Sequence, residues 1–169
     1  MNALQALHTR QSIRQYTSDP VEDRLVNDVL TAGMMAPSAG NERPWQFIVI
    51  RHRNTLKAIS ANHPYASAVE KAPLAILVCG DLVYDNYDGY WVQDCAAAVE
   101  NMLVAAHALG LGSVWIGLYP REQRVADIRA VLTLPEHVVP MAVLPLGYPA
   151  EIRAKEERFD KTRIHYDRW

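Results

Sequence analysis

The chain has 169 residues, half of them hydrophobic, and a net charge of -2 at pH 7. This length and composition predict a single domain, residues 1–169, with a substantial buried core, and they give no general reason to expect nucleic acid as a partner. No apolar run approaches the roughly 18 residues that a membrane helix needs, so we expect a soluble, cytoplasmic protein without a membrane partner.

The segment RQSIRQY follows a first predicted helix, residues 2–8. It places Arg10, Ser12 and Arg14 at alternating positions, so their side chains would share one side of an extended segment. Two guanidinium groups and a hydroxyl group are suited to a phosphate ester. The pattern predicts a phosphate-binding segment, and a solvated charged segment is the alternative.

A second helix is predicted to begin at the SDPVE signal and to end before Pro37. The stretch Ala36–Ile50 then begins with small and turn-forming residues and ends with the β-branched run IVI. Small residues let a backbone approach a flat group closely, and the run predicts a buried strand that holds this loop in place. An ordinary connection between a helix and a core strand is the alternative.

Two short helices, residues 55–60 and 65–71, and a second buried strand, residues 74–79, are predicted next. The loop DLVYDNYDG follows and brings tyrosines close to the start of a long helical pattern. We interpret Tyr87 and Tyr90, together with Trp91, as one wall of a substrate pocket. Tyrosines packed within a surface loop are the alternative.

The longest helical pattern, residues 90–109, has apolar residues at three- or four-residue steps and alanines on its other faces. About 20 residues at 1.5 Å per residue span ~30 Å, so this helix is predicted to be central and buried nearly all round. A chain of this length completes such burial more easily against a second subunit, and the core helix of a single domain is the alternative.

Gly110–Gly112 ends this helix, so the GLG sequence is not a dinucleotide-binding fingerprint, which follows a strand and opens a helix. Residues 113–117 predict a third strand. A further helix, through Leu132, begins after Pro120 with its first amides directed toward the strand end. Prolines within the last strand, residues 138–147, predict that it is bent or lies at a sheet edge.

The C-terminal sequence RFDKTRIHYDRW carries a second basic cluster, for which a solvated tail is the alternative. The chain has no HExxH motif, no GxSxG motif, no P-loop and no CxxC pair. These absences predict no metal site and no side-chain nucleophile, so an organic cofactor would carry any chemistry. Two basic clusters for a phosphate, a small-residue loop for a flat ring and a helix N-terminus for an electron-rich atom together indicate FMN.

Several motifs, in order over nearly the whole chain, resemble the nitroreductase family: RQSIR, APSAGN with PW following, residues 94–117, GYP and the closing KTR. The resemblance implies an α+β fold with a mixed, largely antiparallel sheet flanked by helices. It also implies an obligate homodimer, with a long central helix and two FMN molecules at the subunit interface. NADH or NADPH would be the reductant, and a nitroaromatic compound, a quinone or a related small molecule the acceptor.

The resemblance assigns two groups of FMN-binding residues. The first group would bind the phosphate and the ribityl chain: Arg10, Ser12, Arg14, Lys161 and Arg163. The second group would lie along the isoalloxazine ring, with its first four members from the partner subunit and its last two in a turn whose backbone amide reaches flavin N5: Pro37, Ser38, Ala39, Asn41, Gly117 and Leu118.

The chain departs from the family pattern at two positions near these ligands. Gln11 stands where the family often has arginine, which removes a positive charge near the phosphate. Arg43 stands where the family often has glutamine, which adds a positive charge near the ring or a salt bridge.

The expected reaction is ping-pong hydride transfer, in which NAD(P)H reduces the flavin and leaves before the acceptor occupies the same face, with no catalytic side chain. Positive charge or amide dipoles near flavin N1 and O2 would stabilise the reduced ring. Two alternatives stay open. One is another branch of the superfamily, such as a flavin reductase, a dehalogenase or a flavin-fragmenting enzyme, and the other is a non-catalytic FMN-binding redox sensor.

Overall fold

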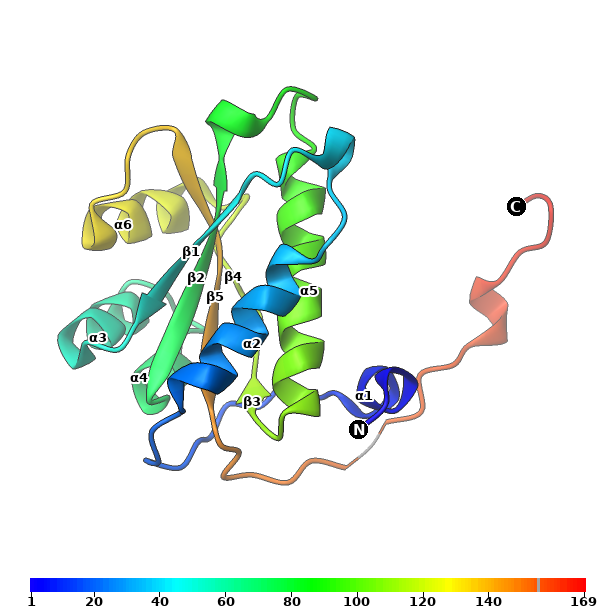
Figure 1. Ribbon diagram of the computed structural model, residues 1–169, viewed down its shortest axis with the longest axis horizontal. Coiled ribbons are helices and arrows are strands. Elements are labelled where there is room, and N and C mark those ends of the chain that lie inside the picture. The colour runs from blue at the N-terminus through cyan, green and yellow to red at the C-terminus, as the bar shows by residue number, and fades with distance from the viewer. Residues whose placement is uncertain (155) are drawn as a thin grey trace.

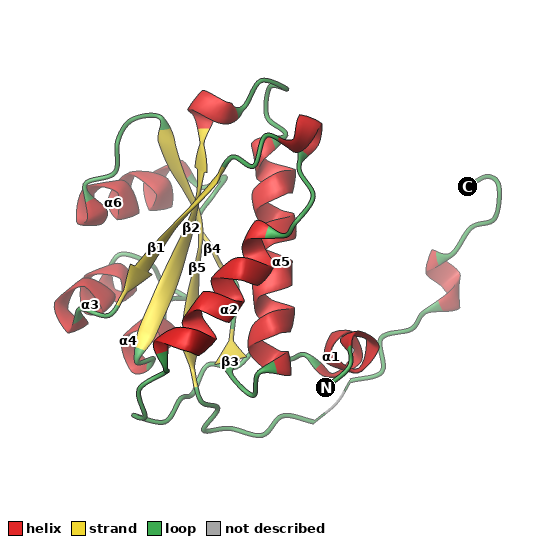
Figure 2. Ribbon diagram, in the orientation of Figure 1, coloured by secondary structure: helices red, strands yellow, loops and turns green. Residues whose placement is uncertain are grey.

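The computed structural model describes residues 1–154 and 156–169. A five-stranded sheet forms its middle layer, and helices cover both faces (Figures 1 and 2). The strand pairs are all antiparallel, which confirms the predicted α+β class with a largely antiparallel sheet. In the order of neighbours the strands are β1 (Trp45–Ile50), β2 (Leu74–Asp81), β5 (Val138–Gly147) and β3 (Gly112–Ser113), with β4 (Ile116–Gly117) also paired to β5.

The helices form two layers. Helices α2 (Asp23–Met34) and α5 (Trp91–Ala108) cover one face of the sheet, and α3 (Arg53–Ala61), α4 (Ser67–Lys71) and α6 (Glu122–Leu132) cover the other (Figure 1). A short helix, α1 (Ala3–Thr9), lies beside the C-terminal part of α5. Short 3-10 turns are η1 (Ala39–Asn41), η2 (Leu82–Tyr84) and η3 (Lys161–Arg163). Among the described residues no helix combines the length and apolarity that a bilayer crossing requires.

Strand β2 separates two hydrophobic cores. Successive side chains of a strand point to opposite faces, so Leu74 and Ile76 pack in the core beneath α2 and α5, whereas Ala75 and Leu77 pack beneath the other three helices. Every residue of β2 is buried, which explains why its sequence is apolar without alternation up to Gly80, before it ends at the buried Asp81.

Helix α5 confirms the predicted central helix. It packs closely on α2, because a Cβ atom at Gly33 would lie only 2.8 Å from Met102 Cγ. Its burial is incomplete, however. Gln93 and Glu100 are exposed and Val104 is half-buried along the stripe that faces away from the sheet, so this stripe is available for packing against another surface.

Three strand predictions were wrong in detail. Strand β5 is central, since β2 pairs along one side and β3 and β4 along the other. The edge alternative is therefore wrong, but the bent alternative agrees with the register: Met141 is an extra residue opposite the Val78–Cys79 step of β2, and Pro140 lies beside this irregularity. Pro145 lies between the residues that pair with β3 and those that pair with β4, where the partner strand is broken. For the same reason residues 113–117 form two short strands rather than one. Strand β1 lies at the sheet edge and is only partly buried.

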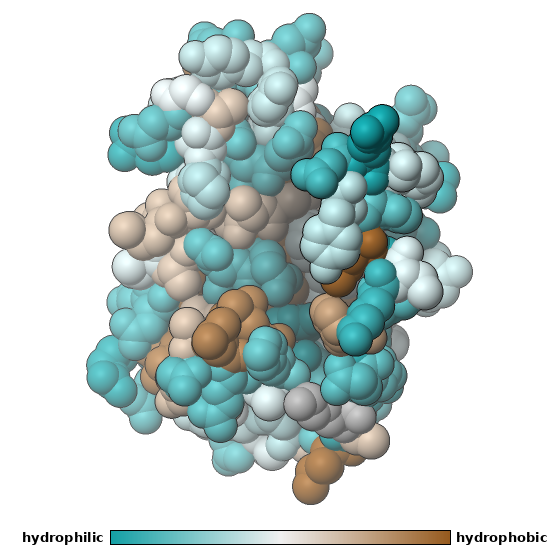
Figure 3. All heavy atoms as spheres, turned by 90° about the vertical axis from the view of Figure 1, so that its right-hand side faces the viewer, coloured by the Kyte–Doolittle hydropathy of each residue, from teal (hydrophilic) through white to brown (hydrophobic). Residues whose placement is uncertain are grey.

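The C-terminal tail leaves the body of the domain and extends beyond α1 (Figure 1). Its large apolar side chains are exposed, and Figure 3, which views this side, shows apolar groups scattered among polar ones. The most exposed of them are Ile152, Phe159, Ile164, Tyr166 and Trp169. Their exposure makes the tail a segment that could pack against another surface.

Candidate functional site

The segment after α1 is held extended along the edge of the sheet. Ser12 forms a parallel bridge with Ser113, and the Ile13 amide donates a 2.9 Å hydrogen bond to the Ser113 carbonyl. Ile13 packs directly over Gly112, where a Cβ atom would lie 2.7 Å from Ile13 Cγ2. These contacts fix the direction of the neighbouring side chains.

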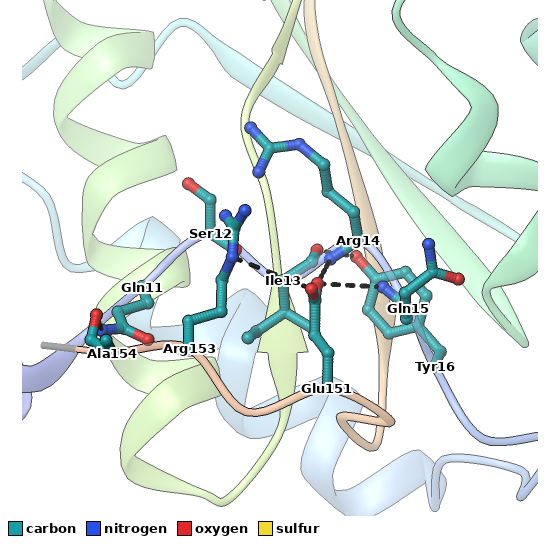
Figure 4. Close-up of polar contacts among 9 residues, drawn as sticks. All are labelled: Gln11, Ser12, Ile13, Arg14, Gln15, Tyr16, Glu151, Arg153 and Ala154. Carbon is teal, nitrogen blue, oxygen red and sulfur yellow. Dashed lines mark hydrogen bonds and ion pairs between the residues drawn. The ribbon is translucent and has the colours of Figure 1, made fainter.

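Figure 4 shows the result: the Ser12 and Arg14 side chains extend to one side of the segment and Ile13 to the other. This is the arrangement that the alternating pattern predicts. On the opposite side, Glu151 accepts hydrogen bonds from the backbone amides of Arg14 (2.6 Å) and Gln15 (3.2 Å). Glu151 therefore holds the segment through its backbone and leaves the Arg14 side chain for another role.

A basic hollow of about 460 Å³ lies beside this segment. Arg153 is part of its wall and donates a 3.1 Å hydrogen bond to the Ser12 carbonyl. The Arg14 guanidinium forms no ion pair within the described ranges, so its charge is not neutralised by a carboxylate there. The polar and charged residues of the hollow are Gln11, Ser12, Arg14, Glu151, Arg153, Glu156 and Arg158. This set of donors suits an anionic group such as a phosphate.

Arg14 also lines a second cavity, of about 510 Å³, which we call the Gly117 cavity. The space above Gly117 is open, because a Cβ atom there would meet nothing nearer than Trp115 Nε1 at 3.8 Å. The cavity is lined by Arg14, His63, Pro64, Tyr65, Ser67, Val114, Trp115, Ile116, Gly117 and Arg124. Arg14 therefore connects a basic hollow with a partly aromatic cavity that has an open stretch of backbone in its wall.

The backbone amides of the two turn residues Gly117 and Leu118 point in different directions. The Leu118 amide donates a 2.8 Å hydrogen bond to the Met141 carbonyl, and its side chain is buried. Since hydrogen-bonded and non-hydrogen-bonded pairs alternate in an antiparallel ladder, the Gly117 amide points away from β5. Of the two predicted ligands, Gly117 is the one placed to donate toward the cavity.

The small-residue loop lies near the N-terminal end of α5. The Ala39 amide donates a 3.0 Å hydrogen bond to Asp94 Oδ1, and the Tyr87 ring covers Gly40 so closely that no Cβ atom would fit. Burial, with the nearby charges of Glu42 and Asp85, raises the pKa of the Asp94 carboxyl, although the Ala39 amide opposes the shift. The loop is thus anchored on a buried carboxyl group, with Pro37, Ser38 and Asn41 beside it.

Within one chain the loop is distant from the phosphate-binding segment. Thr9, just before that segment, hydrogen-bonds His107 near the end of α5, whereas Ala39 bonds Asp94 near its start. Thirteen residues of helix separate these two contacts, which is ~20 Å at 1.5 Å per residue. One chain therefore does not bring residues 37–41 together with Ser12 and Arg14.

Three other predicted phosphate ligands do not line the basic hollow. Arg10 lines an adjoining hollow, and its Nε atom lies 3.6 Å from Glu100 Oε1 on α5. Lys161 and Arg163 lie on the exposed tail, with Arg163 Nε 3.2 Å from Asp160 Oδ2.

The three residues predicted to form an aromatic pocket wall also differ in their surroundings. Trp91 is buried in the hydrophobic core, where it packs against Gly80 and forms an edge-to-face pair with Tyr119, because the first turn of α5 faces β2. Its role in a pocket wall stays a prediction. Tyr87 and Tyr90 are about half exposed at the same end of α5, and their role stays a prediction.

Sequence reasoning missed several residues that line the two cavities: His63, Tyr65, Trp115, Arg124, Glu151 and Arg153. The break at His63-Pro64 between two short helices was visible as a turn signal, but nothing in it indicates what the imidazole faces. Arg124 lies within a helix and has no local signal at all. Only the packing of α4 and α6 on the same face of the sheet brings these two side chains together.

Comparisons with known proteins agree with this architecture. The family model "Nitroreductase family" matches residues 7–71 and 52–148. A protein of Methanothermobacter thermautotrophicus, provisionally named NADH dehydrogenase/NAD(P)H nitroreductase, is 50% identical over 169 residues, which cover 100% of this chain and 88% of that protein.

Two crystal structures extend the comparison. A protein of Bacteroides thetaiotaomicron with the same provisional name has a TM-score of 0.95 at 40% identity, covering 99% of this chain and 98% of that one. A provisionally named nitroreductase of Desulfovibrio desulfuricans, crystallised in complex with FMN, has a TM-score of 0.86 at 32% identity, covering 100% of this chain and 98% of that one.

The Glu151 carboxylate predicts that the stability of the fold depends on pH. The Arg14 amide, with further contributions from the Gln15 amide and nearby arginines, holds the pKa of Glu151 below its ordinary value of 4.5. Its contribution to stability is therefore present above pH 4.5 and is lost as the pH falls through the folded-state pKa. We expect Glu151→Gln to lower the free energy of unfolding in urea at pH 7, and this difference to shrink in acid.

The matched control is Glu136→Gln, which makes the same change on an exposed loop. It should show little effect at either pH. Equal losses in the two variants, or a loss in Glu151→Gln that persists unchanged in acid, would contradict the assigned role of Glu151.

Proposed function

The chain belongs to the nitroreductase family, and we propose that it is an FMN-dependent oxidoreductase that uses NADH or NADPH to reduce nitroaromatic compounds, quinones or related small acceptors. The observation that carries this proposal is the position of Arg14 between the basic hollow and the Gly117 cavity. FMN has a phosphate at one end and a flat ring at the other, so it needs two adjoining sites of these two kinds.

The residues of the basic hollow fit the phosphate end of FMN. The Ser12 hydroxyl and the Arg14 guanidinium are free to bind phosphate oxygens, since Glu151 engages only the backbone of this segment. Arg153 and Arg158 line the same wall but are paired with Glu151 and Glu156, at 3.8 and 2.9 Å, so among the described residues of the hollow Arg14 carries the unpaired positive charge. The Gln11 side-chain amide, in the same wall, already donates a 2.7 Å hydrogen bond to the Ala154 carbonyl. We infer that Ser12 and Arg14 are the principal phosphate ligands within one chain.

The Gly117 cavity fits the ring end. The open backbone at Gly117 lets a flat ring approach closely, and its amide points away from β5 toward the cavity. Arg14 and Arg124 bring positive charge to this cavity, which favours a ring that becomes negatively charged when reduced. When bound, FMN supplies the hydride-accepting and hydride-donating chemistry that no side chain of this site offers.

The two cysteines are not available as nucleophiles. Burial raises the pKa of both cysteine thiols, Cys79 and Cys95, to about 12, so neither forms a thiolate near neutral pH. Among the described residues no group of His, Cys, Asp and Glu is arranged to hold a metal ion. The residues of the site therefore act by binding, orienting and excluding water. We infer a ping-pong order in which NAD(P)H leaves before the acceptor enters the same cavity.

We further infer that the functional unit is a homodimer. The small-residue loop and the tail residues Lys161 and Arg163 do not line the hollow beside Arg14 within one chain, and a second subunit can supply both. The outward stripe of α5 and the exposed apolar side chains of the tail are the surfaces that pairing would cover. In this arrangement the loop with Pro37, Ser38, Ala39 and Asn41 would cover the ring from the partner side.

A charge on the outward stripe of α5 tests the dimer. Val104→Glu places a carboxylate at a half-buried position, where desolvation disfavours it if a partner packs there. We expect the parent protein to sediment as a dimer and Val104→Glu as a monomer that retains less FMN. Ala126→Glu on exposed α6 is the control and should stay dimeric. A parent protein that is monomeric with FMN bound would contradict the shared site.

The visible spectrum tests the proposed activity. The protein loaded with FMN should show flavin bands that bleach when NADH or NADPH is added without oxygen, and they should return when a nitroaromatic compound or a quinone follows. Initial-rate plots at several acceptor concentrations should give parallel lines, as a ping-pong order requires. Bleaching without turnover by any acceptor would instead favour a redox sensor, and a protein that takes up no FMN would refute the proposal.

Arg14→Ala tests the assigned phosphate site. Loss of a charged hydrogen bond costs roughly 1.5–3 kcal/mol, so FMN should bind about 10- to 100-fold more weakly, with a smaller effect on hydride transfer once the site is filled. Equilibrium titration of the apoprotein measures the affinity. Arg24→Ala removes an exposed arginine from α2 and is the control. Because riboflavin lacks the phosphate, its affinity should change little in Arg14→Ala, and an equal loss for both ligands would contradict the assignment.

A further inference from the structure

The Gly117 carbonyl accepts two hydrogen bonds from side chains that are far apart in the sequence. His63 Nε2, from the connection between α3 and α4, lies 3.0 Å away, and Arg124 Nη1, from α6, lies 3.3 Å away. Both donors line the cavity above Gly117. We call the two donors and this carbonyl the Gly117 clamp.

The hydrogen bonds of His63 select one form of its ring. Its Nδ1 atom lies 3.1 Å from the Tyr65 backbone amide, which can only donate, so Nδ1 accepts. Nε2 must then carry the proton that it donates to the Gly117 carbonyl. The side chain is buried, with 4% of its surface exposed, and both ring nitrogens are satisfied. His63 is therefore a neutral imidazole held in a single tautomer and orientation.

Arg124 is held in place by a different contact. Its guanidinium lies over the Tyr65 ring, 5.7 Å from the centroid, and it forms no ion pair with any described carboxylate. The same short stretch of chain, residues 63–65, thus orients both donors: the Tyr65 amide fixes the imidazole and the Tyr65 ring supports the guanidinium.

The clamp adds a second restraint to a peptide group that the sheet holds from one side only. The Gly117 carbonyl shares its peptide plane with the Leu118 amide, which bonds the Met141 carbonyl of β5, and the clamp holds the opposite side of that plane. β4 is only two residues long, and in its ladder the neighbours of Gly117 make the hydrogen bonds to β5 while Gly117 itself faces away. A glycine at such a position has the widest choice of backbone conformation. Fixing its carbonyl from the cavity side limits rotation about the bonds of the Gly117 Cα atom, and through that atom it restrains the preceding peptide group, which carries the Gly117 amide.

We propose that His63 and Arg124 are positioning residues that hold the Gly117 backbone so that its amide is aimed at the ring bound in the cavity. The inference rests on the proposed function, because it concerns the same FMN site. It assigns to two side chains a role in recognising an electron-rich ring atom that neither of them touches. The role depends on the donor at His63 Nε2, and not on the presence of a histidine as such.

Two substitutions separate the two hydrogen bonds of His63. His63→Gln places an amide N–H where Nε2 lies, so it keeps the donor to Gly117 and loses the acceptor for Tyr65. His63→Asn places an amide oxygen where Nδ1 lies, so it keeps the acceptor and loses the donor. His52→Asn, an exposed histidine outside the cavity, is the matched control.

Loss of one buried hydrogen bond predicts that His63→Asn binds FMN roughly 5- to 10-fold more weakly and reduces it more slowly at saturating NADH. For His63→Gln and His52→Asn, the FMN affinity and the rate of FMN reduction should both stay within about twofold of the parent protein. In the apoprotein, nitrogen NMR should find the parent His63 protonated at Nε2 only. The Gly117 amide resonance should move in His63→Asn and stay in place in His63→Gln.

Equal behaviour of the two His63 variants, whether both normal or both defective, would overturn the positioning role, and so would an unmoved Gly117 resonance in a folded His63→Asn protein. A parent protein that does not bind FMN would overturn the proposed function instead. The NMR comparison needs no cofactor, so it distinguishes these two failures.

Discussion

The packing of α5 across one face of the sheet sets the distances on which the rest of this structure depends. The helix is fixed by burial on β2 and β5 and by the close approach of α2 at Gly33. Because a helix is rigid along its axis, the loop anchored at Asp94 and the segment held near His107 cannot come together within one chain. The proposed dimer follows from this separation, since a second copy can bring one chain's loop to another chain's phosphate-binding segment.

The broken edge of the sheet has the opposite effect, because it brings distant groups together. The partner of β5 is interrupted between β3 and β4, close to Pro145, and the residues around the break turn their backbone toward the cavity. Gly117 pairs with Ala142 of β5 on one side, and because β4 has no second neighbouring strand, its other side is open to the cavity. His63 and Arg124 reach this open backbone from two different helical regions.

Residues whose role depends on local periodicity were predictable. The alternation that places Ser12 and Arg14 on one side is a property of any extended segment, and the long helix follows from its apolar stripe. The position of β5 was predicted wrongly because prolines were taken as a sign of an edge. Proline lacks a backbone N–H, but this costs no hydrogen bond at Pro145, which lies opposite a break in the neighbouring strand. The break depends on how β3 and β4 pair with β5, and the β5 sequence does not reveal it.

By itself, then, the sequence determined the helices, most strands, the alternating phosphate-binding segment and, through a resemblance carried by short motifs, the family and its cofactor. The tertiary structure alone decided that Trp91 is buried, that Glu151 holds the Arg14 backbone and that Gly117 rather than Leu118 has an amide directed at the cavity. The reason is physical. Periodicity depends only on residues that are close in the sequence, whereas a hydrogen bond between residues 54 or 137 positions apart depends on how the layers of the fold pack.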